Sequence, residues 1–276
     1  MMKNMKFSVS MCVYGKDNPE WFDTAVQSVL NQTVQTSEIV LVVDGPVSDE
    51  LDAIIRKYEH TELFNVIRFA ENRGHGNARR AGLLATTNEL VALMDADDIS
   101  EYDRFEKQLA VFEGDSTIDV VGGNIVEFIG ESKNVVAKRE VPEKDAEIKE
   151  YMKKRCPMNQ VTVMFKKSSV ERVGGFIDWY CEEDYYLWLR MTLADMKFAN
   201  VSDILVNVRV GEDMYKRRGG WKYFKSETKL QKYMRNNRII GFGTYIANIA
   251  KRFAVQVLLP NCVRGWVFKK FARKKV

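Results

Sequence analysis

Short apolar runs and helical spacings alternate through the first hundred residues. Short, mostly apolar runs predict strands over 7–14, 38–43, 65–69 and 90–94, and the continuous apolar run at 38–43 fits a strand covered on both faces. Between these runs apolar residues recur every three to four positions, which predicts helices after Asn18-Pro19, after Ser48 and near 76–86. Strands that alternate with helices predict an α/β fold with a Rossmann-like, mostly parallel sheet flanked by helices.

The pattern is less regular beyond residue 120. Strand-like segments lie at 120–128 and 161–167, and a helix is expected to begin near Glu182. The sequence YYLWLRMTLA in that helix is apolar almost all round, which predicts a buried helix. With 276 residues, the chain is long enough for one large core and a small appendage.

The ends of the predicted strands carry polar residues. In doubly wound sheets, ligands bind outside the carboxyl ends of the strands. We therefore expect the residues that follow the strands to converge at one edge of the sheet: Tyr14, Asp44, Asn72 and Asp95 to Asp98.

Asp95 and Asp97 form an Asp-x-Asp motif directly after a buried strand. In an extended segment the two side chains point to the same side. Carboxylate oxygens suit Mg²⁺ or Mn²⁺, and Mg²⁺ usually takes only one or two protein carboxylates together with substrate phosphates. The alternative is a solvated turn in which Asp97 or Asp98 caps the next helix.

A second acidic cluster, Glu182-Glu183-Asp184, stands at the start of the predicted buried helix. The helix dipole stabilises negative charge there by about 0.3–1 kcal/mol, which favours the ionised Asp184 that accepts a proton. Burial acts in the opposite direction, because it raises the pKa of a carboxyl group. The alternative is that the three acids only start the helix.

Gly74 and Gly76 precede the third predicted helix, but Arg79 stands where a dinucleotide fingerprint needs its last glycine. This argues against a nicotinamide cofactor. Arg79 and Arg80 are instead candidates to contact phosphate, with ordinary surface charge as the alternative. His75 is interpreted as a loop residue, because no second histidine lies near it to complete a metal site.

Cysteine usage and the N-terminus bear on location. Four dispersed cysteines without a C-x-x-C pair indicate neither a disulfide framework nor a zinc site, which is typical of a cytoplasmic protein. The first residues, MMKNMKFSVSMCVYG, lack a long apolar region and lead directly into a predicted strand, so we expect no signal peptide.

Charge divides the chain at Glu227. Twelve lysines and arginines and no acid follow it, so that within a net charge of +4 the residues 1–227 carry −8. The segment 244–271 mixes apolar and cationic residues, and its longest uncharged part is too short to span a bilayer. We expect an amphipathic helix in the interface of an anionic membrane. The alternatives are packing against the rest of the chain and a homo-oligomer interface, and nucleic acid is not expected as a partner.

Five sequence blocks follow one another along residues 6–210: VSMCVYG with PEWFDTAVQSVLNQT, EIVLVVDG, NRGHGNARRAGL, LMDADDIS and GGFIDWYCEEDYYLWLRM. Together they resemble the motifs of family 2 glycosyltransferases, which have the GT-A fold. The resemblance implies transfer of a sugar from a nucleotide diphosphate donor to a hydroxyl acceptor, with a divalent cation and with inversion at the anomeric carbon.

The resemblance also implies roles for individual residues. Asp97 is implied to hold Mn²⁺ or Mg²⁺ between the two phosphates. Asp184, with Glu183 beside it, is implied to be the base that deprotonates the acceptor. The implied nucleotide-binding residues are Val13, Tyr14, Asp44, Asn72, Arg79 and Asp95.

The chain departs from the family pattern in several places. A single aspartate precedes Gly45 where many relatives carry two, and Gln160 stands where a histidine is frequent. The Q-x-x-R-W pattern of processive synthases is absent, so we expect one sugar to be transferred per encounter. Beyond the last block, Arg217 and Arg218 beside two glycines fit a nucleotide-binding flap, since arginine forks match phosphate oxygens. An ordinary basic loop is the alternative.

We expect a catalytic GT-A domain over 1–210, followed over 211–276 by the flap and a basic helical tail. The predicted activity is that of a non-processive hexosyltransferase that uses a UDP-linked sugar. Its acceptor is expected to be a glycan, glycolipid or glycoprotein at the inner face of the cell membrane. The alternative is a non-catalytic subunit that binds nucleotide sugar within a glycan assembly complex.

Overall fold

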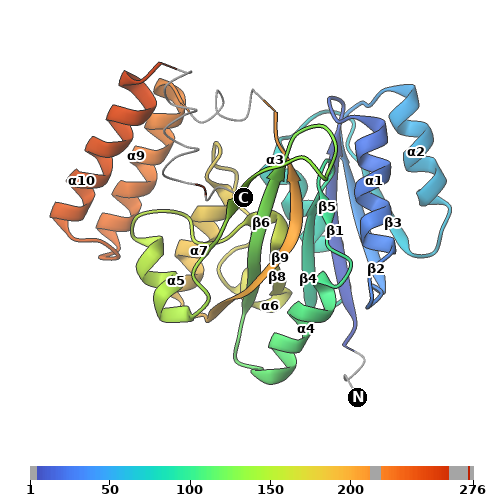
Figure 1. Cartoon of the computed structure of the whole chain (residues 1–276), viewed down its shortest axis with the longest axis horizontal. Helices are drawn as coiled ribbons and strands as arrows, with labels where there is room; N and C mark the ends of the chain where they lie inside the picture. The colour runs from blue at the N-terminus through green and yellow to red at the C-terminus, as the bar shows by residue number, and fades with distance from the viewer. Residues whose placement is uncertain (1–4, 212–218, 261–272, 274–276) are drawn as a thin grey trace.

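The computed structural model describes residues 5–211, 219–260 and 273, and within these ranges it contains a nine-stranded sheet (Figure 1). One half of the sheet is parallel, with the order β3-β2-β1-β4. These strands are β1 (Phe7–Tyr14), β2 (Glu38–Asp44), β3 (Phe64–Arg68) and β4 (Leu90–Asp95). They confirm the four strands predicted from the apolar runs.

The other half of the sheet begins with a reversal of direction at a short strand. β8 (Met164–Lys166) is antiparallel both to β4 and to β6 (Val120–Phe128). Beyond β6 lies β9 (Phe198–Arg209), parallel to it, and β5 (Ile99–Ser100) pairs with β9 in the antiparallel sense. Off this path, β7 (Val135–Arg139) pairs with β6.

The helices begin where the cap residues predict. Asn18 accepts a hydrogen bond from the Trp21 N–H (3.1 Å), and Ser48 accepts one from the Leu51 N–H (3.3 Å). The described helices are α1 (Pro19–Leu30), α2 (Asp49–Glu59), α3 (His75–Ala85), α4 (Arg104–Gly114), α5 (Asp145–Met152), α6 (Lys167–Arg172), α7 (Glu183–Leu193), α9 (Trp221–Asn236) and α10 (Phe242–Phe253). None of them is both long and apolar enough to cross a bilayer.

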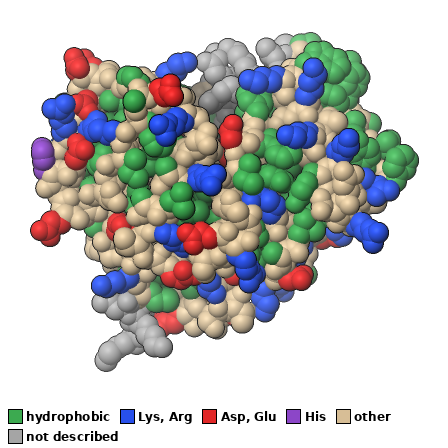
Figure 2. All heavy atoms as spheres, turned by 180° about the vertical axis from the view of Figure 1, so that it is seen from behind, with side chains coloured by type: hydrophobic (Ala, Val, Ile, Leu, Met, Phe, Trp, Pro, Cys, Tyr) green, Lys and Arg blue, Asp and Glu red, His purple; other side chains and the backbone are tan. Residues whose placement is uncertain are grey.

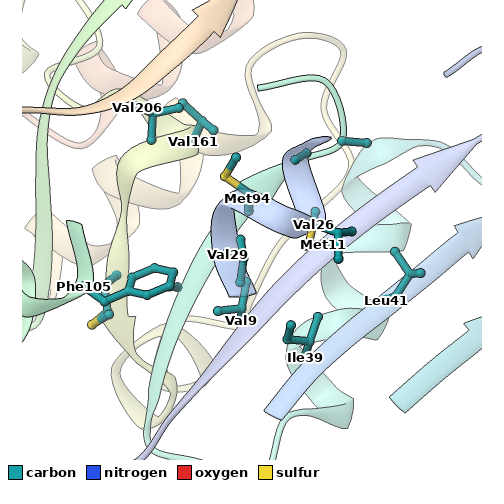
Figure 3. Packing of buried hydrophobic residues seen from close by; sticks show 14 of the residues in the cluster. Val9, Met11, Val26, Val29, Ile39, Leu41, Met94, Phe105, Val161 and Val206 are labelled. Carbon is teal, nitrogen blue, oxygen red and sulfur yellow. The ribbon is translucent and has the colours of Figure 1, made fainter. Parts of the chain in front are cut away.

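Alternate residues of the central strands enter two separate cores. The first core joins β1 and β2 to α1, and Figure 3 shows Val9, Met11 and Leu41 close to Val26 and Val29. The second core is built around α7, whose Trp188 is fully buried. It includes Leu230 and Met234 of α9, so that α9 packs on the same core as the sheet.

Two sequence-based interpretations need correction, and a third reaches beyond the described residues. The next helix after the Asp-x-Asp motif, α4, begins only at Arg104, so neither Asp97 nor Asp98 caps it. The predicted strand 161–167 is mostly a 3-10 turn (Gln160–Thr162) followed by the three residues of β8. In the predicted tail helix, α10 and a π-helical turn (Ala254–Leu258) are present, and the remainder of that segment lies outside the described residues.

Candidate active site

The carboxyl ends of the parallel strands lie together at one edge of the sheet. Tyr14 is the register partner of Asp44, and Cys12 is the register partner of Asp95. Tyr14 is 39% exposed there, whereas the Val13 side chain packs in the first core. The strand-end residues predicted to converge are therefore neighbours across the sheet.

Asp44 fastens the loop that follows β3. Its carboxylate accepts hydrogen bonds from the backbone N–H groups of Arg73 (2.7 Å) and Gly74 (3.0 Å), and Asn72 Nδ2 donates to its carbonyl oxygen (3.1 Å). Gly45 follows with φ +90°, and a Cβ there would lie 2.6 Å from the Asn72 nitrogen. The Asp-Gly pair thus allows two loops to approach closely. Nucleoside binding by Asp44 stays a prediction.

Arg79 is fully buried, which rules out the surface-charge alternative for this residue, whereas Arg80 is exposed. Its guanidinium pairs with the Asp95 carboxylate and donates to the Ser10 carbonyl oxygen (3.2 Å). Its Nε donates to His75 Nε2 (3.2 Å). The structure therefore shows Arg79 holding Asp95 in place, and a contact with phosphate stays a prediction.

His75 continues this connection toward the second acidic cluster. Its Nδ1 lies 2.9 Å from Glu183 Oε1, across 108 residues of sequence. The interpretation of His75 as a loop residue was wrong, because it is the first residue of α3 and contacts both Arg79 and Glu183. A lone histidine carries no pairing pattern, so no signal in the sequence pointed to this link. Asp95 and Glu183 are the two ends of one chain of contacts.

Carboxyl groups crowd around the Asp-x-Asp motif. Burial raises the pKa of Asp17 to about 7, and the negative charges of Asp97 and Asp95 act in the same direction. A hydrogen bond from the Tyr14 N–H acts against this shift. Burial and the same two charges raise the pKa of Asp98 well above its usual value. Asp17 was not predicted from the sequence, because it belongs to no recognised motif.

The oxygen atoms in this cluster fit a hard divalent cation. No preformed group of three or more metal-binding side chains occurs among the described residues. Magnesium sites usually need only one or two carboxylates, since substrate phosphates complete the coordination. Asp97 is half-buried, and its negative charge helps to raise the pKa of Asp17. A dication beside these carboxyl groups would stabilise their ionised forms.

Arg209, at the end of β9, holds the loop of the Asp-x-Asp motif from the other side. Its N–H donates to Asp98 Oδ1 (2.8 Å) and its Nε to the Asp97 carbonyl oxygen (3.1 Å). The guanidinium lies over the rings of Trp21 (4.4 Å) and Phe128 (4.6 Å). No pattern in the sequence points to this residue, because it lies 111 positions from Asp98.

Asp184 is half-buried in the first turn of α7. Burial, followed by the charge of Glu183, raises its pKa to about 6, while the Tyr185 N–H (2.6 Å) and the charge of Arg139 act in the opposite direction. The Cys156 thiol donates to its Oδ2 (3.8 Å). Asp184 is therefore mostly ionised at neutral pH. Because its pKa is raised, it is a stronger base than an ordinary aspartate.

Glu182 differs from the other two acids of its cluster. It is 3% exposed, and burial with the charge of Asp184 raises its pKa to about 8. It therefore stays mostly protonated at neutral pH. The predicted flap residues, Arg217 and Arg218, lie outside the described residues.

Acids at the carboxyl ends of the parallel strands and a raised-pKa carboxyl on α7 share one region of an α/β fold. The model of the protein family described as "Glycosyl transferase family 2" matches residues 8–174 of this chain. The chain belongs to this family. It is therefore a glycosyltransferase, and its fold is the GT-A fold.

Relatives extend the likeness beyond the matched segment of this glycosyltransferase. An uncharacterized glycosyltransferase of Haemophilus influenzae is 39% identical over 270 residues, which cover 98% of this chain and 100% of the relative. The Escherichia coli UDP-Gal:alpha-D-GlcNAc-diphosphoundecaprenol beta-1,3-galactosyltransferase is 34% identical over 269 residues, which cover 98% and 97% of the two chains.

Among solved structures, the glycosyltransferase resembles the mannosyltransferase PcManGT from Pyrobaculum calidifontis in complex with GDP-Man and Mn²⁺. The TM-score is 0.63 at 15% identity, covering 97% of this chain and 75% of that one. This likeness supports the fold alone.

Proposed function

We propose that this glycosyltransferase moves one hexose at a time from a UDP-linked donor to a hydroxyl group of a lipid-linked glycan, with inversion. One observation carries the proposal: contacts through Arg79 and His75 join Asp95, beside the Asp-x-Asp loop, to Glu183, beside Asp184. A donor-side acid cluster and a candidate base therefore face the same region.

On the donor side, the chain's residues position the nucleotide. Asp44 orders the loop 72–74, and Tyr14 is exposed at the end of β1 for contact with the base. Asp97 would hold the divalent cation, which when bound stabilises negative charge on the departing diphosphate. Arg209 fixes the backbone of Asp97, so the carboxylate has a defined position before the donor arrives.

On the acceptor side, Asp184 removes the proton from the attacking hydroxyl group. A base with a pKa near 6 is ionised at neutral pH and accepts a proton more readily than an ordinary aspartate. Attack from the side opposite the leaving diphosphate inverts the anomeric carbon. Glu183, held by His75, stays beside the base and sustains its raised pKa.

The choice of substrates follows the Escherichia coli relative, whose name gives UDP-Gal as donor and a GlcNAc-diphosphoundecaprenol as acceptor. The relative is aligned over nearly its whole length, so these are the first substrates to test. With an acceptor on a lipid diphosphate, the proposed reaction takes place at a membrane surface, and the proposed side is the cytoplasmic face. Mn²⁺ is the first cation to test, since it accompanies GDP-Man in the structural neighbour.

The test is transfer from UDP-Gal to a GlcNAc-diphospho-lipid with Mn²⁺, with the anomeric configuration of the product read by NMR. We expect a β-linked product, because UDP-Gal carries an α-linked sugar. Asp184→Asn should lower kcat by about 10²–10⁴-fold, because it removes the base. Its affinity for UDP with Mn²⁺, measured by calorimetry, should stay within about twofold.

Asp97→Ala serves as the matched variant on the donor side. It should lose the Mn²⁺-dependent part of UDP binding, which Asp184→Asn keeps. An α-linked product, or full activity of Asp184→Asn, contradicts the proposed mechanism. Binding of UDP without turnover of any nucleotide sugar would favour the non-catalytic alternative.

A further inference from the structure

Helix α10 turns two polar side chains inward and several large apolar side chains outward. Asn248 is 5% exposed and donates to the carbonyl oxygen of Lys153 and to Gln231 Oε1, both at 2.9 Å. Arg252 pairs with the buried Glu227 of α9. By contrast Phe242 is 66% exposed and Ile246 is 49% exposed. A surface helix in water has the opposite arrangement.

The outward residues of α10 form one continuous strip. Phe242, Ile246 and Ala250 follow one another at intervals of four, which places them on one face of the helix. Phe253 extends this face, and its ring centroid lies 6.0 Å from that of Trp221, the first residue of α9, which is 58% exposed. We call these five residues the apolar strip. A grouped exposed apolar surface of this kind marks an interaction site.

The helix beside the apolar strip carries a row of cations. In α9 the exposed positions include Lys222, Lys225, Lys229, Lys232 and Arg235. Within 219–260 the only acid is Glu227, which is buried and paired. Figure 2 shows hydrophobic side chains gathered at the end of the molecule that α9 and α10 form, with Lys and Arg side chains beside them. The partner of this surface should therefore be apolar and anionic.

We propose that the α9–α10 hairpin lies in the interface of an anionic bilayer, with the apolar strip inserted below the headgroups and Lys225, Lys232 and Arg235 of α9 at the lipid phosphates. An apolar helix face rimmed by lysines is the composition of interfacial helices. The charge decides against a second copy of the chain, because two such hairpins would bring their cations together. We call the apolar strip and the cations of α9 the docking surface. It begins at Trp221, whereas the membrane-binding segment predicted from the sequence was 244–271.

The docking surface adjoins the acceptor side of the site. Ser226 Oγ donates to the Tyr180 carbonyl oxygen (2.7 Å), and Lys229 lies over the Trp179 ring (4.2 Å). These contacts fasten α9 to the loop that leads into Asp184. In this respect the inference rests on the proposed function: a lipid-linked acceptor would reach the base from the membrane on which the hairpin lies.

The test is flotation of the full chain with vesicles of phosphatidylcholine, with and without phosphatidylglycerol, in the absence of nucleotide sugar. The wild-type protein should float only with the anionic vesicles. The double variant Phe242→Glu/Ile246→Glu should lower the partition coefficient at least about tenfold. Lys225→Glu/Lys232→Glu should also lower it at least about tenfold, since one cation near an anionic surface is worth roughly a fivefold change in binding.

Leu84→Glu is the matched control, because Leu84 is 60% exposed and lies on α3 rather than on the hairpin. This variant should bind vesicles as the wild type does. No flotation of the wild type, or equal flotation of wild type and strip variant, overturns the proposal. So does a wild-type dimer in sedimentation velocity that the strip variant converts to a monomer. Because no reaction is involved, the vesicle result is independent of whether UDP-Gal and the lipid acceptor prove correct.

Discussion

His75 connects the two acidic regions through both nitrogens of one ring. Nδ1 faces the Glu183 carboxylate, and Nε2 faces the Nε–H of Arg79. A neutral imidazole with its proton on Nδ1 donates to the first and accepts from the second, so this tautomer satisfies both contacts. The ring is thereby fixed in one orientation. The side chain is 46% exposed, so it keeps this role at the rim of the site.

His75→Ala should lower kcat about tenfold while leaving the affinity for UDP within about twofold, because it releases Glu183, whereas Arg79 keeps its pairing with Asp95 and its hydrogen bond to the Ser10 carbonyl oxygen. His75→Gln should restore most of the loss, since its amide can donate to Glu183 and accept from Arg79. The measurement is steady-state kinetics with UDP binding by calorimetry.

His60→Ala, at the end of α2, is the control for the loss of a histidine and should match the wild type. If His75→Ala and His75→Gln lowered kcat equally, the contacts of His75 with Glu183 and Arg79 would not explain its effect on catalysis.

Helix α3 carries both His75 and Arg79, so its distance from the sheet sets the geometry of the site. Gly82 lies where the helix approaches β1 most closely, and a Cβ there would overlap the Ser10 hydroxyl. The same Cβ would lie 3.5 Å from Val42 of β2. The glycine is required by this close approach, since it has an ordinary helical φ.

Gly82→Ala should therefore move α3 away from β1 and lower the free energy of unfolding by about 1–3 kcal/mol. The shift should also lower kcat, since it separates Arg79 from Asp95. Urea unfolding and transfer kinetics measure the two effects.

Gly114→Ala is the matched control, because a Cβ at the end of α4 meets nothing within 4 Å. This variant should be as stable as the wild type or slightly more so, by helix propensity. A fully stable and active Gly82→Ala would show that the packing of α3 is not tight.

At the scale of the whole molecule, the α9–α10 hairpin and the sheet meet around the acidic cluster of α7. Glu182 accepts a hydrogen bond from Tyr223 of α9, and this bond partly offsets the effect of burial on its pKa. Arg252 of α10 donates to the Lys154 carbonyl oxygen (3.1 Å). Protonation of Glu182 thus affects the junction between the hairpin and the rest of the protein.

The stability of the molecule should depend on pH through Glu182. Its pKa is raised from 4.5 to about 8, so the folded state binds a proton that the unfolded state has lost across this window. Stability contributed by this group is therefore present below pH 4.5 and is lost as the pH rises toward 8. Glutamine does not ionise, so Glu182→Gln should not lose stability as the pH rises. The variant should be more stable than the wild type at pH 8 by on the order of a few kcal/mol.

Thermal unfolding at pH 5 and pH 8 tests this dependence. The advantage of Glu182→Gln should be small at pH 5 and large at pH 8. Glu147→Gln, at an exposed position of α5, should show no such difference. A variant that is less stable than the wild type at both values would show that the carboxyl is needed in its ionised form.

The parallel half of the molecule could be predicted from the sequence, because its strands are short, mostly apolar runs that alternate with segments of helical spacing. Asp44 and Asp95 were for that reason placed correctly at the ends of the two strands that flank β1. The other half depends on distant pairings. β8 has three residues and reverses the sheet, which no local pattern signals.

The candidate site was predictable only as far as its motifs. Arg79 was recognised as a site residue, but its burial and its pairing with Asp95 follow from packing between α3 and the sheet. His75 and Arg209 were missed, since each acts through a contact with a residue far away in the sequence, and Asp17 was missed because it belongs to no recognised motif. The division into 1–210 and 211–276 stays a prediction.

The position of β9 between β6 and β5 determines when the protein can begin to work. A ribosome adds roughly 5–20 residues per second, so Arg209 is made on the order of ten seconds after Asp98. During that interval the nascent chain carries the Asp-x-Asp loop without the strand that holds it. If the proposed role of this loop in donor binding is correct, we expect a chain still being translated not to consume activated sugar before its last central strand has entered the sheet.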